Sequence, residues 1–392
     1  MAPPSPAATP SLRIGVSAHG TRGRASGLGQ YVRHLLAAWL RGTDAPVEIH
    51  VFCAHEEAND FRVTGHERLV FHVGGRWRSS AGVDILWHQT VLPLWAKALG
   101  LDVLFIAVDR RIPLASPLPV VATVHDLAAW ALAGKYALRQ QFFSQRVVPF
   151  LLRHTRHLIT VSNHTRQDLA RWAGVPADRA TVIHHGVDLS RFATPHPERQ
   201  TGTLARHGLT GPYLLYPARL EHPGKNHVGA VAALALLRQG SGPLPRLVFA
   251  GSPWRQVEAI HQAIDEAGLR DLVTITGFIP DEELVDLYHG ATAMIYPSRY
   301  EGFGMPLVEA MAAGVPIICS TAACLPEVAG DAALFVDPED APGWAAAITR
   351  LLEDPALREE LRHRGRQRAG CFTWERAGAD TLAALRRAAG AA

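Results

Sequence analysis

Short apolar runs alternate with longer amphipathic segments along the N-terminal half of the chain. The apolar runs are rich in β-branched residues and have the length of buried strands, whereas the intervening segments repeat apolar residues with a helical period. This pattern predicts strands at residues 12–17, 47–52, 69–73, 103–106, 120–124 and 157–161, and helices at 27–40, 86–99, 138–152 and 165–173. Alternating strands and helices imply parallel strands joined by crossovers, and hence a doubly wound sheet.

The same alternation begins again after a stretch rich in Pro, Gly and polar residues. Six more strands are expected at residues 213–216, 247–250, 273–276, 293–296, 315–319 and 333–336. The predicted fold is therefore α/β, with Rossmann-like domains at 12–193 and 213–373 and a linker at 194–212. We expect a disordered tail at 1–11 and a C-terminal helical segment at 374–392. Ligands of open α/β sheets bind beyond the carboxyl ends of the strands, which predicts a site in a cleft between the domains.

Composition and charge narrow the class of protein. The chain has 392 residues, of which 48% are apolar and 19% charged, so it can bury two cores and is not of the disordered class. The net charge of +3 does not favour a nucleic acid as the partner. The four cysteines lack CxxC spacing, which suits a reducing cytoplasm. We find no signal-peptide pattern and no apolar run near the roughly 20 residues of a membrane span.

The segment from Tyr296 to Gly314 carries the strongest chemical signal. Glu301 lies on a glycine loop after a predicted strand, and Glu309 lies in a short helix that begins near Pro306. Glycines let the backbone approach a ligand closely, and a helix start binds anions. Two carboxylates beside an anion site suit a ligand that has a phosphate and many hydroxyls. The alternative is structural, with Glu309 favouring its helix start and Glu301 solvated on the loop.

A second group of polar residues follows the first strand of the second domain. Arg219 and Lys225 flank a turn before a predicted helix, and Lys225 is one of three lysines in the chain. Arg provides a planar fork and Lys a point charge, which together suit a diphosphate. An ordinary solvated turn is the alternative. The histidines show no metal-binding spacing and no Asp-x-Asp follows a strand, so we expect no metal ion and no cofactor at the diphosphate.

Two features of the first domain point to the same ligand. The loop from Gly20 to Gln30 contains Gly27 and Gly29 but lacks the third glycine of a dinucleotide fingerprint. We interpret it as a wall of the site that borders the donor phosphate or the acceptor. His125 ends the strand at 120–124 and can bond a sugar hydroxyl or stabilise charge, although an isolated His is more often structural.

These segments resemble, in order and spacing, the family 4 glycosyltransferases, which are retaining enzymes of the GT-B fold. The resemblance runs from about Arg13 to Trp374. It is carried by five motifs: Glu301-Gly302-Phe303-Gly304-Met305-Pro306 through Glu309 to Gly314, Ala218-Arg219-Leu220 with Lys225-Asn226, Thr160-Val161-Ser162, His185-Gly186-Val187-Asp188, and Leu325-Pro326-Glu327-Val328-Ala329-Gly330. Met305 stands where Leu is commoner, and the insert Glu221-His222-Pro223-Gly224 is atypical.

The resemblance assigns roles residue by residue. Arg219 and Lys225 would hold the nucleotide diphosphate. Glu309 would bind the ribose hydroxyls and Glu301 the donor sugar, and His125 would lie over the transferred sugar. The remaining donor-binding positions are Gly27, Gly29, Phe278, Ile279, Gly302, Phe303, Gly304 and Met305, with residues 277–279 facing the base. In this family the helix that begins at Trp374 crosses back to the N-terminal domain.

The expected reaction moves a hexose from a nucleotide diphosphate sugar to a glycan or lipid-linked acceptor. Arg219, Lys225 and the helix starts would stabilise the leaving diphosphate, and no carboxylate is placed as a nucleophile, which favours substitution on the same face. Similarity to bacterial mannosyltransferases of polysaccharide assembly makes GDP-mannose the first candidate donor and a UDP-hexose such as UDP-glucose the second. Two alternative functions remain. The protein could be a non-catalytic subunit that binds a nucleotide sugar, or an enzyme of another class, namely an epimerase or a phosphorylase.

Residues 135–157 interleave basic and aromatic side chains. The run predicts either a basic amphipathic surface that contacts anionic lipid at the inner face of the membrane, or a crossover helix with a solvated face.

Overall fold

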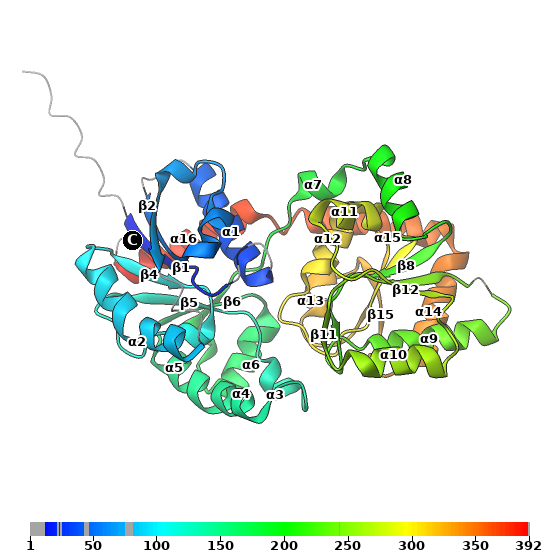
Figure 1. Ribbon diagram of the computed structural model, residues 1–392, viewed down its shortest axis with the longest axis horizontal. Helices are drawn as coiled ribbons and strands as arrows, with labels where there is room; N and C mark the ends of the chain where they lie inside the picture. Colours follow the sequence, from blue (N-terminus) through cyan, green and yellow to red (C-terminus); the bar gives the residue numbers. More distant parts are fainter. Residues whose placement is uncertain are drawn as a thin grey trace, which may run out of the picture. The chain divides into compact units, whose positions relative to one another are not determined.

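The computed structural model of the protein describes residues 12–21, 23, 26–42, 47–74, 81–242 and 244–390. The tail expected at 1–11 lies outside these residues. The chain forms two compact units (Figure 1). The first comprises the chain up to Leu127, Leu138–Gly186 and the segment from Trp374, and the second comprises Ala128–Ala137 and Val187–Thr373.

The first unit is built on a seven-stranded parallel sheet of order β3-β2-β1-β4-β5-β6-β7. Its strands are β1 (Leu12–Ser17), β2 (Val47–Ala54), β3 (Leu69–Gly74), β4 (Val103–Ile106), β5 (Val120–Val124), β6 (His157–Thr160) and β7 (Ala180–Val182). Central strands such as β4 are buried at every residue. Strands covered on both faces read as continuous apolar runs, which is why the sequence located six of them. The three-residue β7 was missed because so short a run has no readable period.

Helices cover both faces of this sheet. They are α1 (Gly27–Arg41), α2 (Ala81–Ala98), α4 (Leu138–Phe142), α5 (Val148–His154), α6 (Asn163–Ala173) and α16 (Trp374–Ala389). The helix predicted at 138–152 is interrupted by a π-helical turn, Phe143–Val147. Helix α1 starts where the Ser26 hydroxyl accepts a hydrogen bond from the Gly29 N–H at 3.0 Å, an N-cap that satisfies an otherwise unpaired donor.

The C-terminal helix α16 packs along α1, although the two are more than 330 residues apart in the chain (Figure 1). The indole Nε1 of Trp39 donates a hydrogen bond to the Gly378 carbonyl at 2.9 Å. The Trp374 ring stacks on His34 with ring centroids 4.6 Å apart. The residues alone left open which unit this helix joins, whereas the family resemblance implied the N-terminal domain. The structure groups the helix with the first unit.

Adding a methyl group at Gly378 is expected to destabilise the first unit. A Cβ built there would lie 2.7 Å from the Ala38 Cβ, so α16 would have to shift away from α1. We expect Gly378→Ala to cost about 1–3 kcal/mol in urea unfolding. The matched control is Gly82→Ala in α2, where nothing lies within 4 Å and the alanine should stabilise by up to about 1 kcal/mol. Equal stability of the two variants would contradict this packing.

The second unit contains a six-stranded parallel sheet of order β12-β10-β8-β13-β14-β15. Its strands are β8 (Tyr213–Tyr216), β10 (Arg246–Phe249), β12 (Val273–Ile275), β13 (Ala293–Tyr296), β14 (Ile317–Ser320) and β15 (Ala333–Val336). All six were expected within one or two residues. A small two-stranded ladder, β9 (Leu220–Glu221) with β11 (Pro253–Arg255), was not.

In the second unit, α9 and α10 lie on one side of the sheet and α11 and α12 on the other (Figure 1). The helices assigned to this unit are α3 (Ala128–Ala131), α7 (Leu189–Ala193), α8 (Pro197–Arg206), α9 (His227–Gln239), α10 (Val257–Glu266), α11 (Asp281–Gly290), α12 (Met305–Ala313), α13 (Leu325–Ala329), α14 (Ala341–Glu353) and α15 (Pro355–Ala369).

The expected linker at 194–212 is corrected by the structure. Its residues include α8, which packs on α11 within the second unit, and the boundary between units falls at Val187. The Arg199 guanidinium donates hydrogen bonds of 2.9 to 3.1 Å to both carboxylate oxygens of Asp286, which is fully buried. Helix α8 is polar, so its composition resembles that of a linker, although the buried carboxylate of Asp286 holds it in place. This resemblance explains why a linker was predicted.

Candidate active site

The two polar groups predicted in the second unit follow neighbouring strands. Arg219 lies three residues after β8, and Glu301 lies five residues after β13. In this sheet β10 and β12 lie on one side of β8, and β13, β14 and β15 lie on its other side. The strand order therefore reverses between β8 and β13, which flank the topological switch point. Ligands of doubly wound sheets bind at such a point, beyond the carboxyl ends of the strands.

A largely buried ion pair joins the turn after β8 to the loop after β13. The Lys225 ammonium donates to Glu301 Oε1 at 2.6 Å, and the Tyr296 hydroxyl donates to the same oxygen at 2.9 Å. The Lys225 and Glu301 side chains are only 18% and 13% exposed. The Tyr216 hydroxyl donates to the Lys225 carbonyl at 2.5 Å, which fixes the turn to the end of its own strand. The sequence predicted both charged residues but not their pairing.

The surroundings of Glu301 keep its carboxylate ionised. Burial alone would raise the pKa of Glu301, but the charge of Lys225 and hydrogen bonds from Lys225 and Ser298 outweigh it and hold the pKa below the ordinary range of a glutamate. Burial and the Glu301 charge raise the pKa of Tyr296 well above its ordinary value, so its hydroxyl remains a donor. An ionised carboxylate at this edge can accept hydrogen bonds from sugar hydroxyls.

Arg219 is exposed at the end of β8. Its guanidinium carbon lies 4.7 Å from the centroid of the Trp254 ring, a cation–π arrangement that orients the side chain without burying its charge.

The backbone next to Arg219 is tightly packed, because a Cβ at Gly251 would lie 2.2 Å from the Ala218 carbonyl oxygen. Sequence reasoning missed Trp254 and Gly251. The position of Gly251 directly after a predicted strand was the available signal.

Helix α12 begins directly behind the glycine loop. Gly304 has φ +88°, a left-handed conformation that favours glycine, and it immediately precedes Met305 at the helix start. Backbone N–H groups at such a start can face an anion. Gly302 and Phe303 are buried, and the Phe303 ring packs edge-on against Phe372 at 5.7 Å. The phenyl group therefore packs within the second unit.

Glu309 has partners different from those of Glu301. The Tyr288 hydroxyl donates to Glu309 Oε2 at 2.8 Å, and burial raises the pKa of Glu309 despite that hydrogen bond. The structure therefore places the two glutamates in separate hydrogen-bonded groups, one with Lys225 and one with Tyr288. We expected both to reach one ligand through a chain reversal, and the described contacts do not join them directly.

The residues expected at the base follow β12, at the outer edge of the same sheet. Gly277 has φ +73° and turns the chain, and the Phe278 side chain is 75% exposed. Ile279 is half-buried. One strand, β10, separates β12 from β8.

In the first unit, His125 directly follows β5 and lies within a cluster of rings. Its Nε2 lies 3.0 Å from the Ala107 carbonyl, which can only accept, so Nε2 carries the proton. The His185 ring stacks on His125 at 5.4 Å, and the Tyr31 ring meets His125 edge-on at 4.9 Å. The sequence indicated His185 only as part of a family motif, whereas the structure places its ring against the predicted site histidine, His125.

The two glycines predicted at the start of α1 differ in their surroundings. A Cβ at Gly29 would lie 1.8 Å from the Gly23 carbonyl oxygen, so this position requires glycine. Nothing lies within 4 Å of a Cβ at Gly27. The close approach of Gly29 therefore shapes the loop, and Gly27 leaves open space at the helix start.

Comparison with known proteins identifies the family of the chain. Residues 25–191 match the family model Glycosyltransferase Family 4, and residues 205–368 match the model Glycosyl transferases group 1. The chain is 31% identical to O-antigen chain mannosyltransferase B of Escherichia coli over 68% of its own length and 70% of that protein. The chain belongs to the family 4 glycosyltransferases.

Other comparisons place this glycosyltransferase among related enzymes. It is 34% identical to a glycogen synthase of Mycobacterium tuberculosis over 66% of its own length and 60% of that protein. A solved sucrose-phosphate synthase of Thermosynechococcus elongatus shares the fold with a TM-score of 0.78, covering 97% of this chain and 100% of that one at 23% identity. The two sheets found here are thus the GT-B fold that the sequence predicted.

Acid is expected to destabilise this glycosyltransferase through His125. Burial lowers the pKa of His125 to about 4, against an ordinary value of 6.5, so between these values the unfolded chain binds a proton that the folded chain does not. Stability should therefore rise with pH across this window, by up to about 3 kcal/mol from this residue. Urea unfolding at pH 4.5 and 7 should show a smaller pH dependence for His125→Gln, and identical slopes would contradict the prediction.

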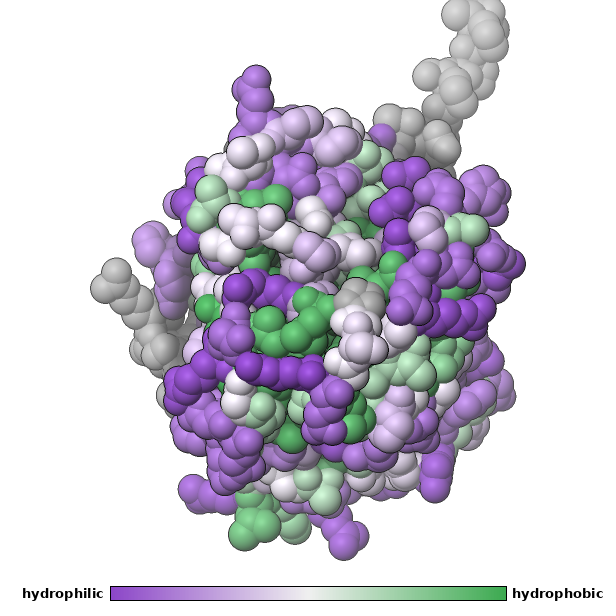
Figure 2. Space-filling model, turned by 90° about the vertical axis from the view of Figure 1, so that its right-hand side faces the viewer, coloured by the Kyte–Doolittle hydropathy of each residue, from purple (hydrophilic) through white to green (hydrophobic). Residues whose placement is uncertain are grey.

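Within the ranges that the structure covers, no cluster of three His, Cys, Asp or Glu side chains is arranged to hold a metal ion. None of the helices described is long and apolar enough to span a membrane. On the face shown in Figure 2, hydrophobic side chains lie in small groups among hydrophilic ones.

Proposed function

We propose that this glycosyltransferase transfers a hexose with retention of anomeric configuration, using GDP-mannose as donor and a glycan or lipid-linked acceptor. The observation that carries the proposal is the Lys225–Glu301 pair at the switch point, with the exposed Arg219 in the same segment after β8 as Lys225. The pair links a cation that can bind a diphosphate to a carboxylate that can accept hydrogen bonds from sugar hydroxyls. The named relative that acts in mannose transfer to O-antigen supports mannose as the sugar.

The proposed chemistry uses the electrostatics of this edge. As the glycosidic bond breaks, the leaving diphosphate gains negative charge, and Arg219, Lys225 and the start of α12 stabilise it. Glu301 accepts hydrogen bonds from the donor sugar, and Glu309 from the ribose hydroxyls. The acceptor hydroxyl attacks the same face, and its proton passes to the leaving phosphate oxygen.

A panel of nucleotide sugars tests donor and activity together. Purified protein is incubated with GDP-mannose, UDP-glucose, UDP-galactose or GDP-glucose, with methyl hexopyranosides as acceptors, and product anomers are assigned by NMR. We expect turnover with GDP-mannose and an α-linked product. Turnover with a UDP-hexose alone would favour the second donor, and one relative is indeed named for glycogen rather than mannose. Binding that raises thermal stability without hydrolysis or transfer would instead indicate a non-catalytic subunit.

We further propose that α4 and α5 contact anionic lipid at the cytoplasmic face of the membrane. Leu138, Phe142 and Phe150 are among the most exposed large apolar side chains described, and Arg139 and Arg146 lie exposed among them. Apolar side chains interleaved with cations suit a charged bilayer surface. Lys135 does not join this surface, because its ammonium lies 3.0 Å from the buried Glu221.

Vesicle co-sedimentation tests this surface. Wild-type protein should bind vesicles of phosphatidylglycerol more strongly than vesicles of phosphatidylcholine, and Leu138→Ser/Phe142→Ser should lose that binding. Leu94→Ser is the control, since Leu94 is similarly exposed, on α2. Binding that is independent of anionic lipid, or equally affected by the control, would exclude the surface.

A further inference from the structure

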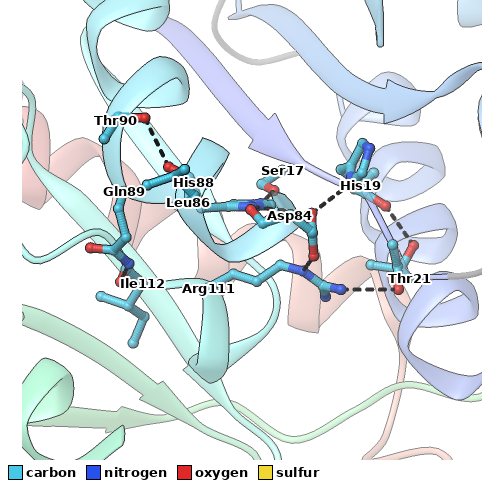
Figure 3. Close-up of polar contacts among 12 residues, drawn as sticks. Ser17, His19, Thr21, Asp84, Leu86, His88, Gln89, Thr90, Arg111 and Ile112 are labelled. Carbon is cyan, nitrogen blue, oxygen red and sulfur yellow. Dashed lines mark hydrogen bonds and ion pairs between the residues drawn. The ribbon is translucent and has the colours of Figure 1, made fainter. Parts of the chain in front are cut away.

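A buried polar cluster lies at the carboxyl end of β1, at the switch point of the first sheet, where β1 separates β2 from β4 (Figure 3). Asp84 of α2 is its centre. Asp84 Oδ1 lies 2.7 Å from His19 Nδ1 and 3.3 Å from His88 Nδ1, and the Arg111 guanidinium donates to Oδ2 at 2.5 Å. These residues come from three separate segments of the chain, and none was singled out by the sequence.

The contacts of Asp84 fix the orientation of the His19 ring. Burial opposes ionisation of Asp84, but hydrogen bonds from His19 and His88 and the charge of Arg111 hold its pKa far below the ordinary range. A carboxylate only accepts hydrogen bonds, so His19 Nδ1 carries a proton and donates it. The Nε2 atom on the other side of the ring is therefore the atom left for another partner.

The two histidines of the cluster differ in how their nitrogens are satisfied. His88 Nδ1 is paired with the Asp84 carbonyl at 2.7 Å, and its Nε2 with the Ser17 hydroxyl at 2.8 Å. His19 is 3% exposed, and its Nε2 has no hydrogen-bond partner among the residues described. Buried polar atoms are nearly always paired, so an unpaired nitrogen at a ligand-binding edge calls for a partner.

We propose that His19 Nε2 is a binding site for a neutral hydroxyl of the sugar acceptor, and that Asp84 positions the ring for it. The proposal rests on the glycosyltransferase function proposed above. A hydroxyl both donates and accepts, so it pairs with Nε2 in either protonation state of the ring. Only β4 separates β1 from β5, and His125 directly follows β5, so the two strand ends lie about 10 Å apart.

The charges around His19 favour a hydroxyl over an anionic group. Two carboxylates face this end of β1, because Glu57 Oε2 accepts from the Gly20 N–H at 3.1 Å beside Asp84. Among the residues that the structure describes here, the Arg111 guanidinium is engaged by Asp84 and by the Gly20 carbonyl. The described carboxylates therefore suit a neutral hydroxyl better than an anionic group. The Trp87 ring packs against His19 with the ring centroids 5.5 Å apart, so acceptor binding at the buried Nε2 requires a side-chain rearrangement.

Two conservative substitutions test the roles of the two ring nitrogens of His19 separately. In His19→Asn an amide N–H can still donate to Asp84, but no atom occupies the Nε2 position, whereas His19→Gln places a polar atom near it. With GDP-mannose and methyl α-mannoside, α-glucoside and α-galactoside as acceptor probes, we expect His19→Asn to raise the acceptor KM about tenfold. His19→Gln should recover part of that loss. Donor hydrolysis, in which water replaces the acceptor, should keep its wild-type rate in both variants.

The outcomes distinguish this inference from the proposed function. A wild type that neither hydrolyses nor transfers any donor would overturn the function itself. Wild-type transfer with an unchanged acceptor KM in His19→Asn would overturn the acceptor site alone. Equal losses of hydrolysis and transfer, or a lowered unfolding midpoint, would show a structural role for His19. Hydrolysis without transfer to any of the three glycosides would overturn the neutral-hydroxyl assignment.

Discussion

Charge reversal at Arg219 is expected to lower kcat/KM for the nucleotide-sugar donor at least about a thousandfold. Its guanidinium lies over the Trp254 ring at the end of β8, where the proposed diphosphate leaves. One well-placed group that stabilises developing charge contributes about 2.7–4 kcal/mol to catalysis. Arg219→Glu removes that contribution and adds repulsion. Initial rates of donor hydrolysis and of transfer measure the effect, because both break the same glycosidic bond.

A matched variant separates this local effect from net charge. Arg270→Glu makes the same change in the same unit, at a side chain that is 77% exposed and paired with Asp265. We expect Arg270→Glu to keep near wild-type kcat/KM. Because Arg219 is exposed, both variants should unfold within about 1 kcal/mol of wild type. Normal turnover by Arg219→Glu would remove this residue from the proposed mechanism.

The strands of both sheets were predictable because of how parallel sheets are buried. Runs such as Tyr213–Tyr216 and Val120–Val124 are covered on both faces, so nearly every residue in them is apolar. Each run is followed by the glycines and charges of a loop at the ligand-binding edge. The rarity of lysine drew attention to Lys225, and the glycine loop drew attention to Glu301. The residue types of the candidate site were thus readable without coordinates.

The pairing within the site was not readable, because strand order is a property of the fold. Lys225 and Glu301 are 76 residues apart, and they meet because β13 returns to lie beside β8. Nothing in the local pattern says that β13 rather than β12 is that neighbour. The same reason hid the cluster around Asp84, whose members come from β1, α2 and the segment after β4.

Buried polar residues caused the remaining errors. Asp286 is fully buried in α11, and its pairing with Arg199 turns an apparently polar linker into the packed helix α8. His185 joins the ring cluster of His125 through stacking, a contact without sequence periodicity. Sequence patterns identify apolar burial well because apolar residues repeat with the element. A single buried charge or ring has no repeat, so its partner becomes visible only in three dimensions.

Separating the Lys225–Glu301 pair should disable the enzyme from either side. Lys225→Met leaves Glu301 buried without its cation and is expected to lower kcat/KM about 10²–10³-fold. Glu301→Gln keeps the shape but loses a charged acceptor for sugar hydroxyls, and we expect a loss of about 10²-fold. If the two side chains act as a unit, the double variant should be no slower than the slower single variant, since their effects are not additive.

The pH dependence of Lys225→Met gives a second readout. Burial then raises the pKa of Glu301 without the opposing ammonium, so the acid limb of the hydrolysis profile should move to higher pH than in wild type. In Glu301→Gln that limb should lose the contribution of Glu301. Lys97→Met in α2 is the control for loss of a lysine and should leave the profile unchanged. Strictly additive losses, together with an unmoved acid limb in Lys225→Met, would show that the two residues act separately and that the pair does not organise the donor site.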